Sequence, residues 1–572
     1  MAQRWLAGML LFATGSAWAA VDVRIEGVDD ELRANIEAFV SINQEGVADA
    51  NPRRIRRLHE RAPGDIRRAL EPFGYYRPQI ESQLQGGSGD WVARYRVEAG
   101  ERVRLARVRI QLTGPAADDP AFRRAVREAP LTEGAPLAHA DYEATKQRFT
   151  ELTAQRGYLD ASWSRSTLRV FPERGTAEAV LELESGPRYR FGEISFIDSE
   201  FNESFLRRYL QFEPGDPYDS GALLELQYAF NDSDYFSRVD VSAQRDQAQD
   251  GRIPVEVRLH PRPQHRYTFG LGYGTDTGAR VSVGREDRWV NSRGHRFATE
   301  FQIAEVSNRL HARYSIPLDQ PWRERMDLLA AVGEQDIGDG RTRQRQLGIQ
   351  RVTTHSGWQS TVGVELERTT DEISGESTTR QLVMPRLGVT RGRFNDAVFA
   401  TRGYRLSADL NGGTETFGSD VSFLRLHLDG YFVRGLWPGG RVLLRGELGR
   451  TQIDDVDDLP LSQRFFAGGD QSVRGFSYQS LAPRNDEDDV VGGRYLGVAS
   501  AELEQLVAGN WGAAVFVDHG NAMNDLNAER RTSAGVGLRY RSPVGVFRVD
   551  IARPIDGEGG DARLHLSLGV DL

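Results

Sequence analysis

Cysteine is absent from the 572-residue sequence. A chain without thiols cannot form a zinc ribbon, a thiol nucleophile or a disulfide-exchange site, so these classes are excluded. Long apolar runs are also lacking: only 39% of the residues are hydrophobic, and no segment beyond the N-terminus approaches the roughly 20 apolar residues of a transmembrane helix. The formal net charge is -10, which argues against nucleic acid as the main partner.

The first twenty residues have the pattern of a secretory signal. Arg4 supplies a positive start, Leu6–Ala13 a short apolar stretch, and Ala17-Trp18-Ala19 a small-residue cleavage site. The apolar stretch is too short to span a bilayer as a helix. We therefore expect Met1–Ala20 to be a signal peptide and the rest of the chain to be exported.

Residues 21–264 are predicted to form three α+β repeats. Short strands near Val23–Ile25, Val108–Ile110 and Ile194–Phe196 recur at nearly equal spacing, which is typical of a tandem array. Each strand is followed by two amphipathic helical segments and then by a pair of strands. The predicted repeats cover residues 21–98, 99–186 and 187–264.

Beyond His265 the helical periodicity gives way to strict alternation of apolar and polar residues. Segments of about ten residues suit tilted membrane strands, and charged faces that recur over the whole region indicate a polar lumen rather than a dry core. The alternation predicts an outer-membrane barrel of about 16 antiparallel strands over residues 265–572. A soluble all-β domain is the alternative. In the last segment the apolar face is formed by Leu564, Leu566, Leu568, Val570 and Leu572.

A loop of roughly forty residues between the predicted eleventh and twelfth strands is far longer than a usual hairpin connection. It contains Val473-Arg474-Gly475-Phe476. The planar guanidinium of Arg474 suits docking on a carboxylate. With the repeats in the periplasm, this is the sixth outer loop. The alternative is an ordinary solvated loop.

A candidate partner for Arg474 lies two strands later. By period two, Phe516, Asp518 and Gly520 share one face of their strand and offer an aromatic surface, a carboxylate and room for close backbone approach. Glu502, on the intervening strand, is a second candidate carboxylate. The alternative is that both acids merely line a wet lumen.

These two motifs together resemble the superfamily of outer-membrane assembly factors and transporters that includes the BamA, TamA and two-partner-secretion proteins. The resemblance implies that the loop folds into the barrel and that Arg474 pairs with Asp518, with Phe516 and Gly520 beside it. The repeats resemble POTRA modules. Three modules without a plug helix ahead of them, and the ending Gly569–Leu572, resemble the TamA subfamily.

The resemblance further implies a factor that helps insert or secrete β-barrel proteins such as autotransporters. Its expected partners are unfolded outer-membrane clients, outer-membrane lipid and a TamB-like protein anchored in the inner membrane. The first and last barrel strands meet without a covalent hairpin, and Gly270, Gly272 and Gly274 weaken the first strand. Our hypothesis is that client strands add at this lateral seam.

Two other functions are considered. A secretion conduit through the lumen is the alternative within the same class. An enzyme barrel is not expected, because the sequence has neither a Gly-x-Ser-x-Gly elbow nor a His-Glu-x-x-His pair. We expect no cofactor and no metal: His260 and His265 flank a proline-rich linker and are interpreted as hinge residues.

Overall fold

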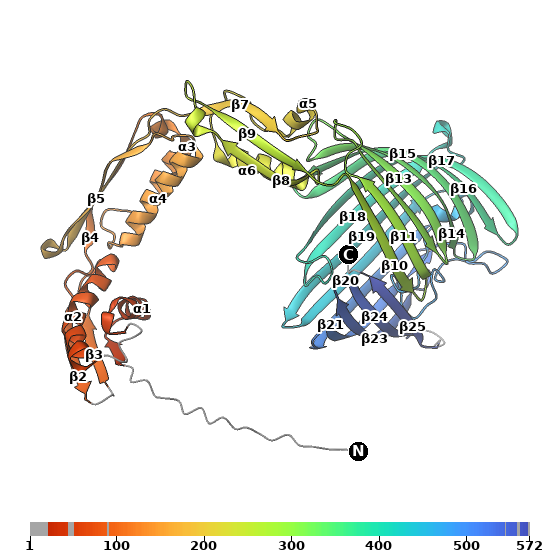
Figure 1. Ribbon diagram of the computed structural model, residues 1–572. Coiled ribbons are helices and arrows are strands. Elements are labelled where there is room, and N and C mark those ends of the chain that lie inside the picture. The colour runs from red at the N-terminus through yellow and green to blue at the C-terminus, as the bar shows by residue number, and fades with distance from the viewer. Residues whose placement is uncertain (1–20, 44–50, 88–90, 544, 557–560, 570–572) are drawn as a thin grey trace, which may run out of the picture. The chain divides into compact units, whose positions relative to one another are not determined.

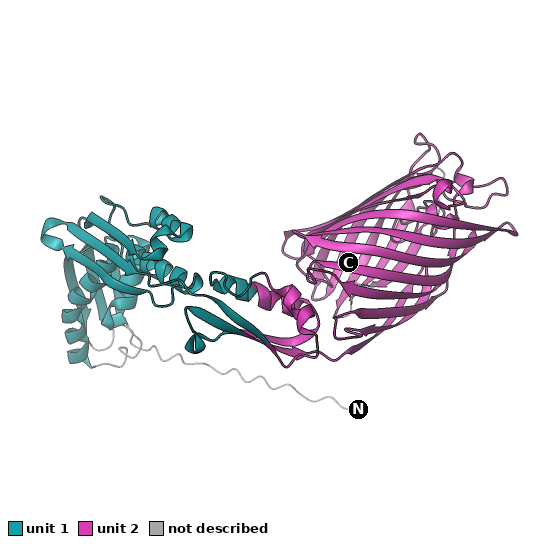
Figure 2. Ribbon diagram, turned by 90° about the horizontal axis from the view of Figure 1, so that it is seen from above, with its two compact units in different colours: residues 1–195, 212–224, 242–255 teal, residues 196–211, 225–241, 256–572 magenta. Residues whose placement is uncertain are grey.

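The computed structural model describes residues 21–43, 51–87, 91–543, 545–556 and 561–569 (Figure 1). The predicted signal peptide and the seam residues Val570 and Leu572 lie outside the described residues. The chain divides into two compact units, coloured separately in Figure 2. The division falls within the third repeat, because residues 212–224 and 242–255 group with the first two repeats and residues 225–241 group with the barrel.

Each repeat contains a strand, two helices and two further strands, as predicted. The elements of the first are β1 (Asp22–Glu26), α1 (Asp30–Phe39), α2 (Pro52–Leu70), β2 (Gln79–Gly86) and β3 (Trp91–Glu98). Those of the second are β4 (Arg104–Thr113), α3 (Pro120–Glu128), α4 (His139–Gln155), β5 (Ser162–Phe171) and β6 (Thr176–Glu184). Those of the third are β7 (Arg190–Ile197), α5 (Glu203–Leu206), α6 (Ser220–Asp232), β8 (Phe236–Ala243) and β9 (Arg252–Pro261). In every repeat the last strand lies at the centre of the sheet, in the orders β1-β3-β2, β4-β6-β5 and β7-β9-β8.

Local sequence explains where the helices of the first repeat begin. The Asn51 side chain accepts a hydrogen bond from the Arg54 backbone N–H, and Pro52 occupies the first helical position of α2. Asp29 caps α1 in the same way through the Leu32 N–H. The apolar side of α2, including Ile66, is buried in a core with Tyr95 of β3. The caps therefore determine where these helices begin, and the period of the apolar residues determines which side of α2 packs on the sheet.

Sixteen antiparallel strands close into a barrel within the described residues, which confirms the predicted fold class (Figure 1). No helix in this part of the chain is long and apolar enough to cross a membrane. The strands are β10 (His265–Gly274), β11 (Gly278–Asp287), β12 (Arg296–Ala304), β13 (Ser307–Pro317), β14 (Glu324–Ile337), β15 (Gly340–His355), β16 (Trp358–Ile373), β17 (Glu376–Phe394), β18 (Arg402–Gly413), β19 (Phe423–Trp437), β20 (Gly440–Gln452), β21 (Tyr495–Ala508), β22 (Trp511–Met523), β23 (Arg531–Ser542), β24 (Gly545–Pro554) and β25 (Arg563–Gly569).

Strand length departs from the expected ten residues in the middle of the barrel. β17 has 19 residues, and β15 and β16 have 16 each. The extensions are polar and form ion pairs across strands, such as Arg343 with Glu334 and Glu372. Alternation detects only the part of a strand that faces lipid, so polar hairpins that continue beyond the apolar band are missed.

The apolar faces point outward, as a membrane barrel requires. Phe269 and Leu271 on β10 are 78% and 82% exposed, and Val364 and Val536 on distant strands are also exposed. The side chains that alternate with these apolar residues along each strand face the lumen. Charged residues such as Asp518 and Arg539 are buried there. The distribution is the reverse of a soluble sandwich, which buries its apolar faces.

The first and second repeats are joined by a small hydrogen-bonded contact. The Val103 N–H donates to the Gly74 carbonyl at 2.9 Å, and Arg102 donates to the Phe73 carbonyl at 2.9 Å. The Tyr76 hydroxyl lies 2.6 Å from Nε2 of His139. Burial, with a smaller contribution from Glu71, raises the pKa of Tyr76 to about 12, and burial lowers the pKa of His139. Nε2 of the neutral His139 ring can accept the Tyr76 hydroxyl proton, whereas in the protonated ring both nitrogens are donors.

Acidification is expected to weaken this contact. The lowered pKa of His139 means that the contribution of its neutral ring to stability is present above the ordinary value of 6.5 and is lost as the pH falls through the lowered pKa. Hydrogen exchange, corrected for intrinsic rates, should show less protection around Val103 at about pH 5 than at about pH 8. The His139→Gln variant should lose this pH dependence, and an unchanged dependence would contradict the role of His139.

Candidate functional site

The long loop (residues 453–494) connects β20 to β21 and packs against the inner wall of the barrel. Within the loop, the Phe465 N–H donates to the Gly493 carbonyl at 2.9 Å, and Ala467 bridges to Leu481. Phe465, Ala467 and Val473 are buried in one cluster with Leu496 and Val498 of β21 and Ala522 of β22, and Phe476 packs against it. The loop therefore has an apolar core shared with the barrel wall and is not an ordinary solvated loop.

Arg474 lies at the tip of this loop, and only 3% of its surface is exposed. Its Nε donates to Oδ2 of Asp518 at 2.7 Å and its Nη2 to Oδ1 at 2.9 Å, which is the bidentate geometry of a strong ion pair. The Arg474 backbone N–H also donates to Oδ2 of Asp518, at 3.1 Å. Asp518 is fully buried. One carboxylate thus holds both the side chain and the backbone of the loop tip.

Further charged groups surround this pair. Nη1 of Arg474 donates to Glu502 at 2.7 Å and to Asp550 of β24 at 3.2 Å. Arg539 of β23 contacts the same two carboxylates and also Glu504, at 2.9 Å for the latter. The charged network consists of three arginines (Arg441, Arg474 and Arg539) and four carboxylates (Glu502, Glu504, Asp518 and Asp550), and Arg445 lies beside it, donating to the Gln471 carbonyl. Pairing of opposite charges makes their burial tolerable, whereas removing one member leaves the opposite charge buried and unpaired.

Aromatic and glycine residues shape the space around Arg474. Its guanidinium carbon lies 3.3 Å from the ring centre of Phe516, and this stacking adds to the ion pair. Gly535 is opposite Phe516 on β23, and a Cβ there would overlap the Phe516 ring. Gly475 has a φ of 90°, which glycine adopts readily, and its N–H donates to Nε2 of His565 at 3.0 Å. Glycine at these positions is required by geometry.

The other two predicted partners of Arg474, Glu502 and Gly520, both face the lumen, but they have different neighbours. Glu502 is part of the charged network, as described above. Gly520 is buried on the same face as Asp518, but a Cβ there would meet Cα of Val498 at 2.8 Å, so this glycine permits close approach of β21 rather than of the loop.

Sequence reasoning missed Arg539, Glu504, Asp550 and Arg441. Strand alternation already placed Arg539 and Asp550 opposite the apolar faces of β23 and β24. Alternation does not give the register between strands, which pairs Asp518 with Ser533 and Asp550 with Gly537, so it does not show which lumen-facing side chains meet.

Few backbone interactions join β10 to β25 at the seam of the barrel. Within the described residues the two strands share one register pair, Gly274 with Ser567, and Thr275 donates from its N–H to the Leu566 carbonyl at 3.1 Å. By contrast, β10 and β11 pair along their whole length. Gly270 and Gly272 of β10 are half-buried, and Leu564 of β25 is exposed, while Leu566 and Leu568 are half-buried.

The long loop contacts both sides of this seam. The Asp470 N–H donates to Asp276, in the turn that follows β10. The Gly475 N–H donates to His565 of β25. The segment around Arg474 therefore bridges two strands that share little direct pairing.

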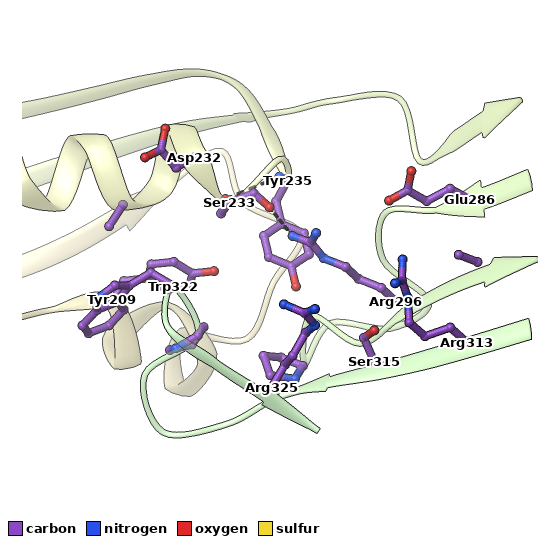
Figure 3. Close-up of a pocket in the computed structure, with 14 residues that line it drawn as sticks. Tyr209, Asp232, Ser233, Tyr235, Glu286, Arg296, Arg313, Ser315, Trp322 and Arg325 are labelled. Atoms are coloured by element: carbon purple, nitrogen blue, oxygen red, sulfur yellow. Dashed lines mark hydrogen bonds between the residues drawn. The ribbon is translucent and has the colours of Figure 1, made fainter. Parts of the chain in front are cut away.

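A cavity of about 360 Å³ lies where the third repeat meets the start of the barrel strands (Figure 3). Arg296 of β12 donates to the Ser233 carbonyl and stacks 4.1 Å from the ring centre of Tyr235, whose hydroxyl donates to the Gly294 carbonyl. Tyr209 and Trp322 line the opposite part of the cavity. These contacts hold the segment around Ser233 and Tyr235, between α6 and β8, on the mouth of the barrel.

Comparison with known proteins supplies the family. The model of the Omp85 superfamily domain matches residues 201–571, and that of the POTRA domain TamA domain 1 matches residues 22–99. The outer membrane protein assembly factor BamA of Nitratidesulfovibrio vulgaris is 22% identical over 64% of this chain and 48% of its own length. BamA of Neorickettsia risticii is 23% identical over 70% of this chain and 58% of its own length. The chain thus spans about half the length of these curated relatives.

A solved structure supports the fold. BamA of Haemophilus ducreyi lacking POTRA domains 1–3 superposes with a TM-score of 0.66 at 16% identity, covering 81% of this chain and 99% of that one. The superfamily match covers well over half of the sequence. The chain belongs to the Omp85 superfamily and is an outer-membrane β-barrel preceded by POTRA modules in the periplasm.

Proposed function

We propose that this protein is an assembly or translocation factor that helps insert or secrete outer-membrane β-barrel proteins, acting at the seam between β10 and β25. The observation that carries the proposal is the combination of a thinly paired seam with a loop that anchors on both of its sides. The names of the curated relatives, outer membrane protein assembly factors, support the same class of function.

The seam offers the chemistry that an incoming strand needs. A strand edge presents unpaired backbone N–H and C=O groups, and an extended segment can satisfy them by adding as a further strand. In β10, glycines at 270, 272 and 274 remove side chains that would strengthen packing against β25. Opening the described part of the seam breaks little native pairing, so the cost of exchange with a client strand is small.

The long loop keeps the barrel intact while the seam opens. Arg474 ties the loop to β21, β22 and β24 through Glu502, Asp518 and Asp550. Removing one partner from a buried ion pair costs about 3–5 kcal/mol, so these anchors are far stronger than the contacts across the seam. A secretion conduit through the lumen would have to displace this loop, and the charged network opposes that movement.

Within the superfamily we assign the chain to a TamA-like role. The match of the first repeat to the POTRA domain TamA domain 1 and the occurrence of three repeats support this assignment. The partners would then be a TamB-like protein anchored in the inner membrane and unfolded clients such as autotransporters. The boundaries 21–98, 99–186, 187–264 and 265–572 are part of this proposal.

Crosslinking the seam is expected to abolish client assembly. Gly274 and Ser567 form a register pair, and the native chain has no cysteine, so a G274C/S567C variant can form a single defined disulfide. The S282C/Q302C variant is the matched control, because it joins β11 to β12, which are already connected. Assembly of a client barrel into vesicles should be lost only in the oxidised seam variant and should return on reduction. Full activity of the oxidised seam variant would end the seam hypothesis.

The Arg474→Ala variant is expected to release the long loop. The lost pair leaves Asp518 buried without its counter-charge, which should cost about 3–5 kcal/mol of loop docking. Limited proteolysis in detergent should cleave the loop much faster, and client assembly should fall more than abundance. Arg484→Ala is the control: Arg484 lies in the same loop, its side chain is 45% exposed, and its one ion pair among the described residues is with exposed Asp488, so a cost of about 0.5 kcal/mol or less is expected. Similar cleavage of the two variants would contradict the anchor.

A further inference from the structure

The surface of the first repeat carries a dense cluster of arginines. α2 contains seven within its 19 residues, although the whole chain has a net charge of -10. All seven are exposed. This cluster, called the arginine face below, consists of Arg53, Arg54, Arg56, Arg57, Arg61, Arg67 and Arg68.

The helical period explains why these side chains share one surface. Ile55, Ala62, Ile66 and Leu70 are buried with exposed fractions of 0–2%, and they form the side of α2 that packs on the sheet. The arginines lie on the opposite side. Because α2 rises about 1.5 Å per residue and is held by the core, the arginine face extends for about 23 Å from Arg53 to Arg68 on a fixed backbone.

Most of this positive charge is uncompensated within the described part of the chain. Only Arg61 and Arg68 form ion pairs there, both with the buried carboxylate of Asp65. The equivalent helix of the second repeat differs in composition: α4 has two basic residues, Lys146 and Arg148, and three acidic ones, whereas α2 has seven arginines and two acidic residues, Glu60 and Asp65. The arginine face is therefore a property of this helix and not of the repeat fold. Like charges held this close repel, and an anionic partner relieves the repulsion.

We propose that the arginine face is a docking surface for an acidic segment of a second protein in the periplasm. Guanidinium groups bind carboxylates through two parallel hydrogen bonds, and a fixed row of them matches a run of Asp and Glu side chains. The surface is less suited to a membrane, because helices that bind lipid insert an apolar side. In α2 that side is buried in the core, and no exposed side chain of this fully described helix is large and apolar.

The proposal goes beyond the assembly function and is tested without it. Binding of a fluorescent oligoglutamate peptide to the full-length protein in detergent is measured, with an oligoglutamine peptide of equal length as the neutral reference. The R53Q/R57Q/R67Q variant is expected to bind oligoglutamate at least about tenfold more weakly, and added salt should weaken wild-type binding.

The matched control is R123Q/R124Q/R127Q on α3, which removes three exposed arginines from the second repeat and changes the net charge equally. Its affinity should stay within about twofold of the wild type, because the lost charges lie outside the docking surface. Equal losses in the two variants, or no binding by the wild type, would overturn the proposal. Binding that depends on the arginine face and occurs to phosphatidylethanolamine–phosphatidylglycerol vesicles but not to oligoglutamate would overturn it in favour of lipid.

A second measurement locates the peptide. Gly64 lies on the arginine face, a Cβ there meets nothing within 4 Å, and the native chain has no cysteine, so G64C accepts a single photocrosslinker. Oligoglutamate should crosslink to this position. Retained affinity without crosslinking would place the peptide elsewhere and contradict the proposal.

Discussion

A guanidinium buried inside the barrel is the constraint on which the rest of the structure depends. An isolated charge in such a place is costly, so Arg474 stays there only because Asp518, Glu502 and Asp550 surround it. Each carboxylate comes from a different strand, and each in turn needs an opposite charge, which Arg539 supplies for two of them. The loop tip and three strands of the barrel wall are thereby fixed as one unit.

This unit lies beside the weakest part of the wall. β24 carries Asp550 and pairs fully with β25, whereas β25 shares little described pairing with β10. The loop contacts Asp276 after β10 and His565 on β25, so it supports the two strands whose mutual pairing is thin. We propose that the wall opens at this place, because client assembly by strand addition requires a free strand edge.

The sequence predicted the architecture well because apolar–polar alternation is a local signal. The barrel of about sixteen strands follows from neighbouring residues and was found as predicted. The polar ends of β15–β17 were missed because they extend beyond the lipid-facing band. The positions of Arg539 and Asp550 in the charged network depend on interstrand register, which no local pattern contains. The functional roles of Arg474, Asp518 and the seam residues remain predictions.

A double-mutant cycle on Arg474 and Asp518 tests the central claim most directly. The free energy of unfolding would be measured by urea titration for the wild type, Arg474→Ala, Asp518→Ala and the double variant in lipid vesicles. A buried bidentate pair predicts that the two substitutions are not additive, with a coupling energy of about 2 kcal/mol or more. Additive effects, within about 0.5 kcal/mol, would show that the loop is not held by this pair and would contradict the account.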